Sequence, residues 1–309
     1  MKNLLLRLLV FFAVCGGGLV FAADGDLFTR RDDVIYGRKF GTALTMDVFT
    51  PKQDANGAAV IFTVSGGWFS AREAINIVLL RELLQRGYTV FAVMHGSQPK
   101  YTIPEAIADM KLAVRYIRAN AADFSIDPNR IGITGGSAGG HLSLMIGTSD
   151  DEGDQKSATA QGRASSRVQA VACFFPPTDF LNYGTPGFAW LSQGPKDGFR
   201  APFDFQVWNP DLKEFDPVDE PTRLKIAREI SPAHHVTKDD PPTMIIHGDK
   251  DLLVPLQQSE LIMEKFKAAG VPCELVVKKG AAHGWLDMPK DMSTISDWFD
   301  KYLKSSAAK

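Results

Sequence analysis

Three residues, Gly135, Ser137 and Gly139, form the pattern G-x-S-x-G, which is the spacing expected around a nucleophilic serine. A serine hydroxyl is a weak nucleophile, so it must be held where a base can reach it. A sharp turn from a strand into a helix does this, and glycine avoids collisions two residues to either side. We predict that Ser137 attacks a carbonyl carbon and that the N–H of Ala138 points at the developing oxyanion.

A glycine-rich turn of this kind also occurs after many strands that have no chemistry, so the prediction depends on finding a base. The base in turn needs an acid that orients it. His283 lies in a small-residue loop after the last predicted strand, where a side chain can turn over the edge of a sheet. His247 sits inside an apolar run, as a structural residue would, and His141 follows the serine on its own helix. We therefore predict His283 as the base.

Two aspartates, Asp249 and Asp251, follow a predicted strand and are candidates for the acid. The chain order Ser137, Asp251, His283 is that of a nucleophile on a strand-turn-helix with its acid and base on later strand ends, which favours Asp251. The alternative is Asp249, although an aspartate beside a glycine also commonly braces a turn.

The loop Ser65-Gly66-Gly67-Trp68 follows a buried apolar run. Backbone without a side chain can approach a substrate closely. We predict that the N–H groups of Gly66 and Gly67, together with that of Ala138, form an oxyanion hole. We also expect Trp68 to contact the substrate.

The elements that must position these residues alternate along the chain. A first hairpin is expected at 34–40 and 44–50. Apolar runs then predict strands at 58–64, 88–93, 130–134, 168–175, 243–247 and 274–277. Helical periodicity predicts helices at 74–86, 103–120, 257–269 and 294–303. Strands that alternate with helices of this length indicate a mostly parallel sheet with helices on both faces.

Residues 180–230 lose this pattern and hold many aromatic residues among Gly, Pro and Asp. Such a long stretch inside a compact domain is typical of a lid or a binding loop. Its aromatic side chains can form a small core of their own, or some of them can line a substrate cleft. The polar stretch 150–167 is expected to be a surface loop.

Composition limits the remaining possibilities. With 309 residues, 45% of them hydrophobic, the chain can bury a large globular core, and its net charge of −2 gives no case for binding nucleic acid. Residues 1–22 resemble a secretory signal peptide cleaved after Ala22; the alternative is an uncleaved membrane anchor, for which the apolar core is short. We therefore expect a secreted or periplasmic protein with no stable membrane insertion. Cys173 and Cys273 then remain, either as one disulfide or, as we favour, as free thiols.

The chain resembles α/β-hydrolases of the esterase/lipase group, close to the hormone-sensitive-lipase-like and bacterial feruloyl/acetyl esterase branches. The resemblance rests on the segment through Trp68, on 103–141 with its serine motif, on 247–255 and on 282–284. It implies an α/β-hydrolase fold in a single domain at 23–309, with a lid-like insertion at about 180–230. It also implies a triad of Ser137, Asp251 and His283, no metal and no cofactor.

One residue departs from the family pattern. The oxyanion motif of this group usually begins His-Gly-Gly, whereas this chain has Ser65 at the first position. Because the donors are backbone N–H groups, we expect activity to survive. The role of the histidine in bracing the loop is expected to be lost.

The sequence thus predicts a serine carboxylesterase that forms an acyl-enzyme on a small-molecule or carbohydrate ester. Export and analogy favour acetyl or feruloyl esters of polysaccharides. A serine peptidase of the prolyl oligopeptidase type is an alternative, but such enzymes usually add a propeller domain. A non-catalytic binding protein on a hydrolase scaffold is another, but such proteins usually lose a triad member. Nothing in the sequence indicates an oligomeric state.

Overall fold

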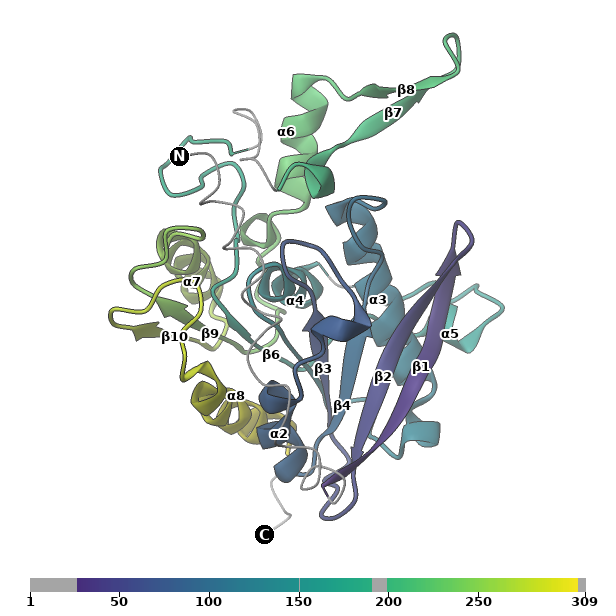
Figure 1. Ribbon diagram of the computed structural model, residues 1–309, viewed down its shortest axis with the longest axis vertical. Coiled ribbons are helices and arrows are strands. Elements are labelled where there is room, and N and C mark those ends of the chain that lie inside the picture. Colours follow the sequence, from purple (N-terminus) through teal and green to yellow (C-terminus); the bar gives the residue numbers. More distant parts are fainter. Residues whose placement is uncertain (1–26, 150, 191–198, 305–309) are drawn as a thin grey trace.

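The computed structural model describes residues 27–149, 151–190 and 199–304, and a twisted eight-stranded sheet runs through the middle of this part (Figure 1). The strand order is β1-β2-β4-β3-β5-β6-β9-β10. The first two strands pair antiparallel, β2 pairs antiparallel with β4, and all later neighbours are parallel. The strands are β1 (Phe28–Lys39), β2 (Thr42–Pro51), β3 (Ala59–Val64), β4 (Thr89–Met94), β5 (Ile131–Thr134), β6 (Ala170–Phe174), β9 (Thr243–Gly248) and β10 (Cys273–Lys278).

Helices cover both faces of the sheet, which confirms the predicted α/β-hydrolase layering. Two apolar clusters lie on opposite faces, because alternate strand side chains point to opposite sides. In β3, for example, Ile61 joins one cluster while Val60 joins the other. The first cluster is covered by α3 (Ile103–Ala119), α4 (Ala138–Thr148) and α7 (Gln257–Ala269), and the second by α2 (Ile77–Gln85) and α8 (Met288–Leu303).

The helix ends follow from local sequence. In α3, Thr102 and Glu105 form a capping box and a proline occupies the first turn. In α7, Gly270 ends the helix with φ of +77°, a left-handed conformation that glycine adopts without strain. Because strands β3 to β10 of the main sheet run parallel, their carboxyl ends lie at the same edge of the sheet, and the predicted site residues follow these ends.

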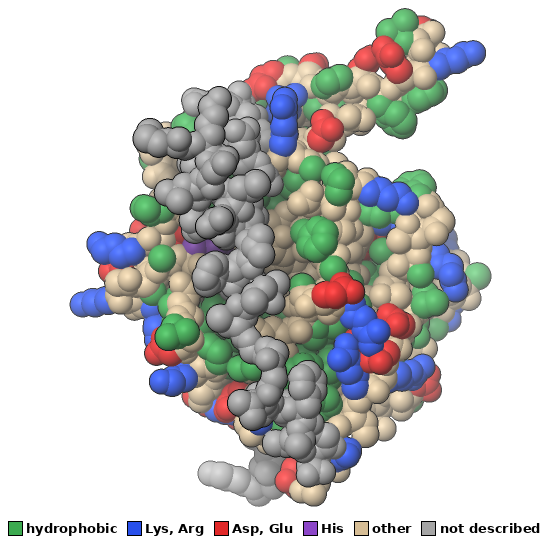
Figure 2. Space-filling view, viewed as in Figure 1, with side chains coloured by type: hydrophobic (Ala, Val, Ile, Leu, Met, Phe, Trp, Pro, Cys, Tyr) green, Lys and Arg blue, Asp and Glu red, His purple; other side chains and the backbone are tan. Residues whose placement is uncertain are grey.

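The stretch predicted as a lid-like insertion contains regular structure that the sequence did not indicate. It holds β7 (Gln206–Asn209), β8 (Glu214–Pro217) and α6 (Glu220–Glu229), and the β7–β8 hairpin projects from the body of the molecule (Figure 1). Figure 2 shows apolar and acidic side chains together on this hairpin, where Trp208 and Phe215 pack edge to face and are exposed. The closing motion of a lid stays a prediction.

The aromatic residues of this stretch divide into two groups. Trp190, Phe203 and Phe205 are buried and join the first apolar cluster, so they act as core. Trp208 is half exposed on the hairpin. The residues 191–198 lie outside the described part.

Both cysteines beyond the N-terminal segment are free thiols, Cys173 in β6 and Cys273 at the start of β10. Burial raises the pKa of each thiol above its ordinary value. The predicted signal peptide, residues 1–22, lies outside the described residues. Within the described ranges no helix has the length and apolar character needed to cross a membrane.

A buried carboxylate ties the antiparallel edge of the sheet to the loop after β3. The Asp47 side chain is fully buried and accepts hydrogen bonds from Arg30, from Arg72 Nε at 3.0 Å and from the Asp33 N–H at 2.9 Å. Burial alone would raise the pKa of Asp47, but these hydrogen bonds outweigh it and lower the pKa.

We predict that Asp47→Ala lowers the free energy of unfolding by about 1 to 2 kcal/mol, because it removes the buried acceptor of the Asp33 N–H and leaves Arg30 and Arg72 with the exposed Asp32 as their partner. Urea denaturation of both proteins measures the difference. The control is Lys225→Ala, which removes an exposed pair with Glu229 at 3.8 Å and should change stability by less than about 0.5 kcal/mol. Equal losses in the two variants would contradict the assignment.

Candidate active site

The turn that carries Ser137 is strained. Ser137 has φ of +54° and ψ of −119° between β5 and α4, a conformation that L-residues rarely adopt. Its N–H donates to the carbonyl of Phe174 at 3.0 Å, and its own carbonyl accepts from the N–H of His141 at 2.8 Å. These bonds fasten the turn to β6 and to the helix, so the hydroxyl is held above the sheet edge.

The glycines around Ser137 are required by contact between backbones. A Cβ on Gly135 would lie 2.7 Å from the carbonyl carbon of Gly139, and one on Gly139 would lie 2.8 Å from the carbonyl oxygen of Thr63 in β3. The steric reason predicted for Gly135 is therefore confirmed. For Gly139 the obstacle is the neighbouring strand, which the sequence alone does not show.

The structure brings Ser137, Asp251 and His283 together at the carboxyl ends of β5, β9 and β10. His283 Nε2 lies 2.9 Å from Ser137 Oγ, and His283 Nδ1 lies 2.7 Å from Asp251 Oδ2. Because the carboxylate can only accept, Nδ1 carries the proton and Nε2 is left to accept from the serine hydroxyl. This is the geometry that nucleophilic catalysis by serine requires.

Asp251 is held as an anion. Its side chain is fully buried, and Oδ1 accepts the N–H groups of Leu253 and Val254, both at 2.9 Å. Burial alone would raise the pKa of Asp251, but hydrogen bonds from His247, from His283 and from the Val254 N–H hold it far below its ordinary value. The carboxylate therefore orients His283 without taking up its proton.

The alternative acid, Asp249, is differently placed. Its Oδ1 accepts the N–H of Gly280 at 2.6 Å, so it braces the turn between the loops after β9 and β10. His247 lies in β9 with its ring fully buried, Nδ1 at 2.7 Å from Ser259 Oγ and Nε2 at 2.9 Å from the Val254 carbonyl.

The oxyanion loop corrects one predicted donor. The N–H of Gly66 donates to the carbonyl of Phe69 at 2.9 Å, so it is already taken. In the described part of the chain, the N–H groups of Gly67 and Trp68 have no recorded acceptor. Ala138, the first residue of α4, has no intrahelical acceptor for its N–H. The geometry thus favours Gly67, Trp68 and Ala138 as the donors. The Trp68 amide was not predicted, because glycine backbone was the signal used to find donors in this loop.

The side chain of Trp68 anchors this loop to the nucleophile helix. Trp68 is buried, and its indole N–H donates to His141 Nδ1 at 3.1 Å. His141 Nε2 in turn donates to the Ile230 carbonyl at 2.7 Å. The rings of Phe180 and Phe203 pack against the indole, with centroids 6.0 Å and 5.1 Å away. Contact between Trp68 and a substrate stays a prediction.

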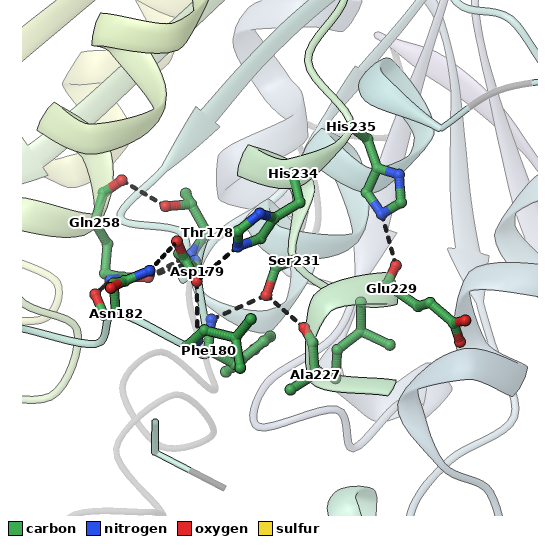
Figure 3. A network of polar contacts seen from close by, with 12 residues as sticks. Thr178, Asp179, Phe180, Asn182, Ala227, Glu229, Ser231, His234, His235 and Gln258 are labelled. Atoms are coloured by element: carbon green, nitrogen blue, oxygen red, sulfur yellow. Dashed lines mark hydrogen bonds and ion pairs between the residues drawn. The ribbon is translucent and has the colours of Figure 1, made fainter. Parts of the chain in front are cut away.

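A polar network fixes the loop after β6 beside this aromatic cluster (Figure 3). Asp179 is buried, and its Oδ1 lies 3.1 Å from His234 Nε2. The N–H groups of Thr178 and Asp179 both donate to Gln258 Oε1 at 2.8 Å, and the N–H of Phe180 donates to Ser231 Oγ at 2.9 Å. The loop is thereby joined to α7 and to the segment after α6.

In the ranges that the structure describes, no three or more His, Cys, Asp or Glu side chains are gathered where they could share a metal ion.

A parallel sheet whose strand ends carry a strained serine turn, a buried acid and a histidine between them defines an α/β-hydrolase of the esterase class. Residues 46–266 match the BD-FAE family, and the protein belongs to that family. Residues 227–309 are also similar to the dienelactone hydrolase family.

Known proteins agree with this class. The chain is 29% identical to the probable carboxylic ester hydrolase LipM of Mycobacterium tuberculosis over 78% of this chain and 52% of that protein. It thus spans about half the length of that relative. A truncated carbohydrate esterase from gut microbiota is 29% identical with a TM-score of 0.70, covering 90% of this chain and 98% of that one. An acetyl ester-xyloside bifunctional hydrolase from Caldicellulosiruptor lactoaceticus is 25% identical with a TM-score of 0.66, covering 87% and 93%.

The buried histidines make stability depend on pH. Burial lowers the pKa of His141 and of His95 to about 4, whereas an unfolded chain binds these protons near pH 6.5. Stability is therefore fully present above pH 6.5 and falls as the pH drops from 6.5 toward 4. Each histidine contributes about 1.4 kcal/mol per pH unit in that window.

We predict that His141→Gln makes this pH dependence shallower by the share of one histidine. Urea denaturation at pH 7, 6 and 5 measures the slope for each protein. If the free energy of unfolding changes with pH by the same amount in the wild type and the variant, His141 binds its proton equally well in the folded and unfolded states, and the prediction is wrong.

Proposed function

We propose that this protein hydrolyses carboxylic esters through an acyl-enzyme on Ser137. The observation that carries the proposal is the placement of His283, which contacts both Ser137 Oγ and the buried carboxylate of Asp251. The resemblance to esterases over most of the chain supports the same reaction class.

Each step follows from the contacts. Ser137 Oγ bonds to the carbonyl carbon while its proton moves to His283 Nε2, and the carbonyl electrons move to oxygen. The N–H groups of Gly67, Trp68 and Ala138 stabilise this oxyanion. The tetrahedral intermediate then expels the alcohol, which takes the proton from His283. Water repeats the sequence on the acyl-enzyme and releases the acid, and the negative charge of Asp251 stabilises the imidazolium in both halves.

As substrate we propose acetyl esters of carbohydrates, with feruloyl esters as the second class to assay. Two similar structures support the choice, since one is named a carbohydrate esterase and the other an acetyl ester-xyloside hydrolase. We also propose that the protein is exported, on the pattern of residues 1–22. Amino-terminal sequencing of protein secreted by its host should then begin at Ala23, and a sequence that begins at Met1 would refute export with cleavage.

The function is tested by hydrolysis of p-nitrophenyl acetate and of acetylated xylo-oligosaccharides by the purified protein and by Ser137→Ala. We expect kcat to fall by roughly 10,000-fold or more in the variant, because the nucleophile is lost. Equal rates in both proteins would reject the proposal. Cleavage of peptides without cleavage of esters would instead indicate a serine peptidase.

The two aspartates of the loop after β9 form a matched pair. Asp251→Asn should lower kcat by about 10,000-fold, since the amide cannot hold His283 in the required tautomer. Asp249→Asn keeps an acceptor for the Gly280 N–H and should change kcat by only a few fold. Steady-state kinetics on p-nitrophenyl acetate compares them, and a larger loss in Asp249→Asn would reverse the assignment of the acid.

A further inference from the structure

The oxyanion loop rests on the residues that follow β4. Ser65, the first residue of the loop, places its Oγ 2.8 Å from His95 Nε2. The His95 ring is buried at the end of β4, and the two residues are thirty positions apart in the chain. A side chain from one strand end thus contacts the loop that follows the neighbouring strand, β3.

The direction of this hydrogen bond is fixed. His95 Nδ1 lies 2.8 Å from the carbonyl oxygen of Gly96, which can only accept, so Nδ1 carries the ring proton. Nε2 is left as the acceptor, and the hydroxyl of Ser65 donates to it. Burial keeps the ring neutral by lowering the pKa of His95 to about 4, so the arrangement persists at neutral pH.

Other bonds join the same two segments. The hydroxyl of Ser70 donates to the Val64 carbonyl at 2.6 Å and accepts the N–H of His95 at 3.2 Å. The N–H of Gln98 donates to the carbonyl of Trp68 at 3.2 Å. The loop is therefore held along its length by the chain that follows β4.

The main chain of Ser65 also lies near the nucleophile helix, at Gly139. The carbonyl oxygen of Ser65 would lie 3.4 Å from a Cβ on Gly139, two residues beyond the serine. The position of Ser65 therefore helps to set the separation between Ser137 and the N–H groups of Gly67 and Trp68.

We propose that His95 is a positioning residue for the oxyanion hole, and that it acts through the hydroxyl of Ser65. The inference rests on the proposed esterase function. It corrects the expectation that the loop has lost its brace: a histidine braces it from β4 instead of from position 65. The oxyanion forms only as the tetrahedral intermediate is approached. Loss of the contact between Ser65 and His95 displaces the N–H donors of the loop, so it should lower kcat and leave KM nearly unchanged.

The test uses Ser65→Ala, His95→Phe and the double variant, assayed on p-nitrophenyl acetate. Each single change should lower kcat about 10- to 100-fold with KM within about twofold. The double variant should lose no more than the worse single variant, because both changes remove one shared contact. His95→Gln should keep most of the activity, since its amide oxygen can accept from Ser65 near the position of Nε2.

A second measurement remains informative where His95→Phe folds poorly. His95 lines a hollow of about 330 Å³ bounded also by Ser70, Ser97 and Tyr101. Imidazole added to His95→Ala can enter from this hollow and should restore at least tenfold of the lost kcat, and should not do so in Ser65→Ala. The matched control is Ser166→Ala, another buried serine, whose Oγ accepts the Asp151 N–H at 2.9 Å away from the triad loops. It should keep the wild-type kcat.

Three results would overturn the inference. Wild-type kcat in folded Ser65→Ala and His95→Phe, with Ser137→Ala inactive, would refute the role of His95 and leave the esterase function standing. Multiplicative losses in the double variant, without rescue by imidazole, would show that the two residues act separately. A wild-type protein without esterase activity would remove the proposed function and this inference together.

Discussion

The close approach of three backbones at the start of α4 is the constraint on which the site depends. Strand β3 lies against Gly139, and the carbonyl of Phe174 at the end of β6 would lie 2.8 Å from a Cβ on Gly140. No side chain fits between these backbones. The chain passes from β5 into α4 through a tight turn, in which Ser137 has a strained conformation. The whole of α4 is buried as a result, and the strain is sustained by the packing of the sheet and helices around it. The conformation of Ser137 therefore depends on the packing of the core as well as on the G-x-S-x-G motif.

Electrostatics then separates the base from the other histidines near the strand ends. His247 is fully buried, contacts Ser259 Oγ and the Val254 carbonyl, and lies 3.4 Å from Asp251 Oδ2. His95 and His141 each face one backbone carbonyl and one neutral donor, from Ser65 or Trp68. Such a pair of contacts satisfies a neutral ring and supplies no negative charge to balance a positive one. His283 instead faces a buried carboxylate and is partly exposed at the serine. Of these four rings, His283 is the one that contacts both a buried carboxylate and the serine hydroxyl, which is the placement that a general base for Ser137 needs.

Much of the fold could be predicted because its signals are local. Continuous apolar runs marked the buried strands, and helical apolar periodicity marked α3 and α7. The triad followed from motifs whose loops must meet at one sheet edge. The hairpin β7–β8 was missed because its strands have four residues each and exposed, non-alternating side chains. The bond that occupies the Gly66 N–H and the contact between Ser65 and His95 were not predicted, because they depend on how a loop folds back on itself or on another strand.

The two kinds of contact at this site differ in how they can change during evolution. Gly135 and Gly139 face main-chain atoms, which are the same whatever residue is present, so no compensating substitution elsewhere can make room for a side chain there. The contact between Ser65 and His95 joins two side chains. Paired substitutions at the two positions can replace this contact during evolution. The imidazole that supports the loop can then move from one strand end to another, while the backbone donors stay in place. The oxyanion loop can therefore drift in sequence, whereas the turn that carries the nucleophile cannot.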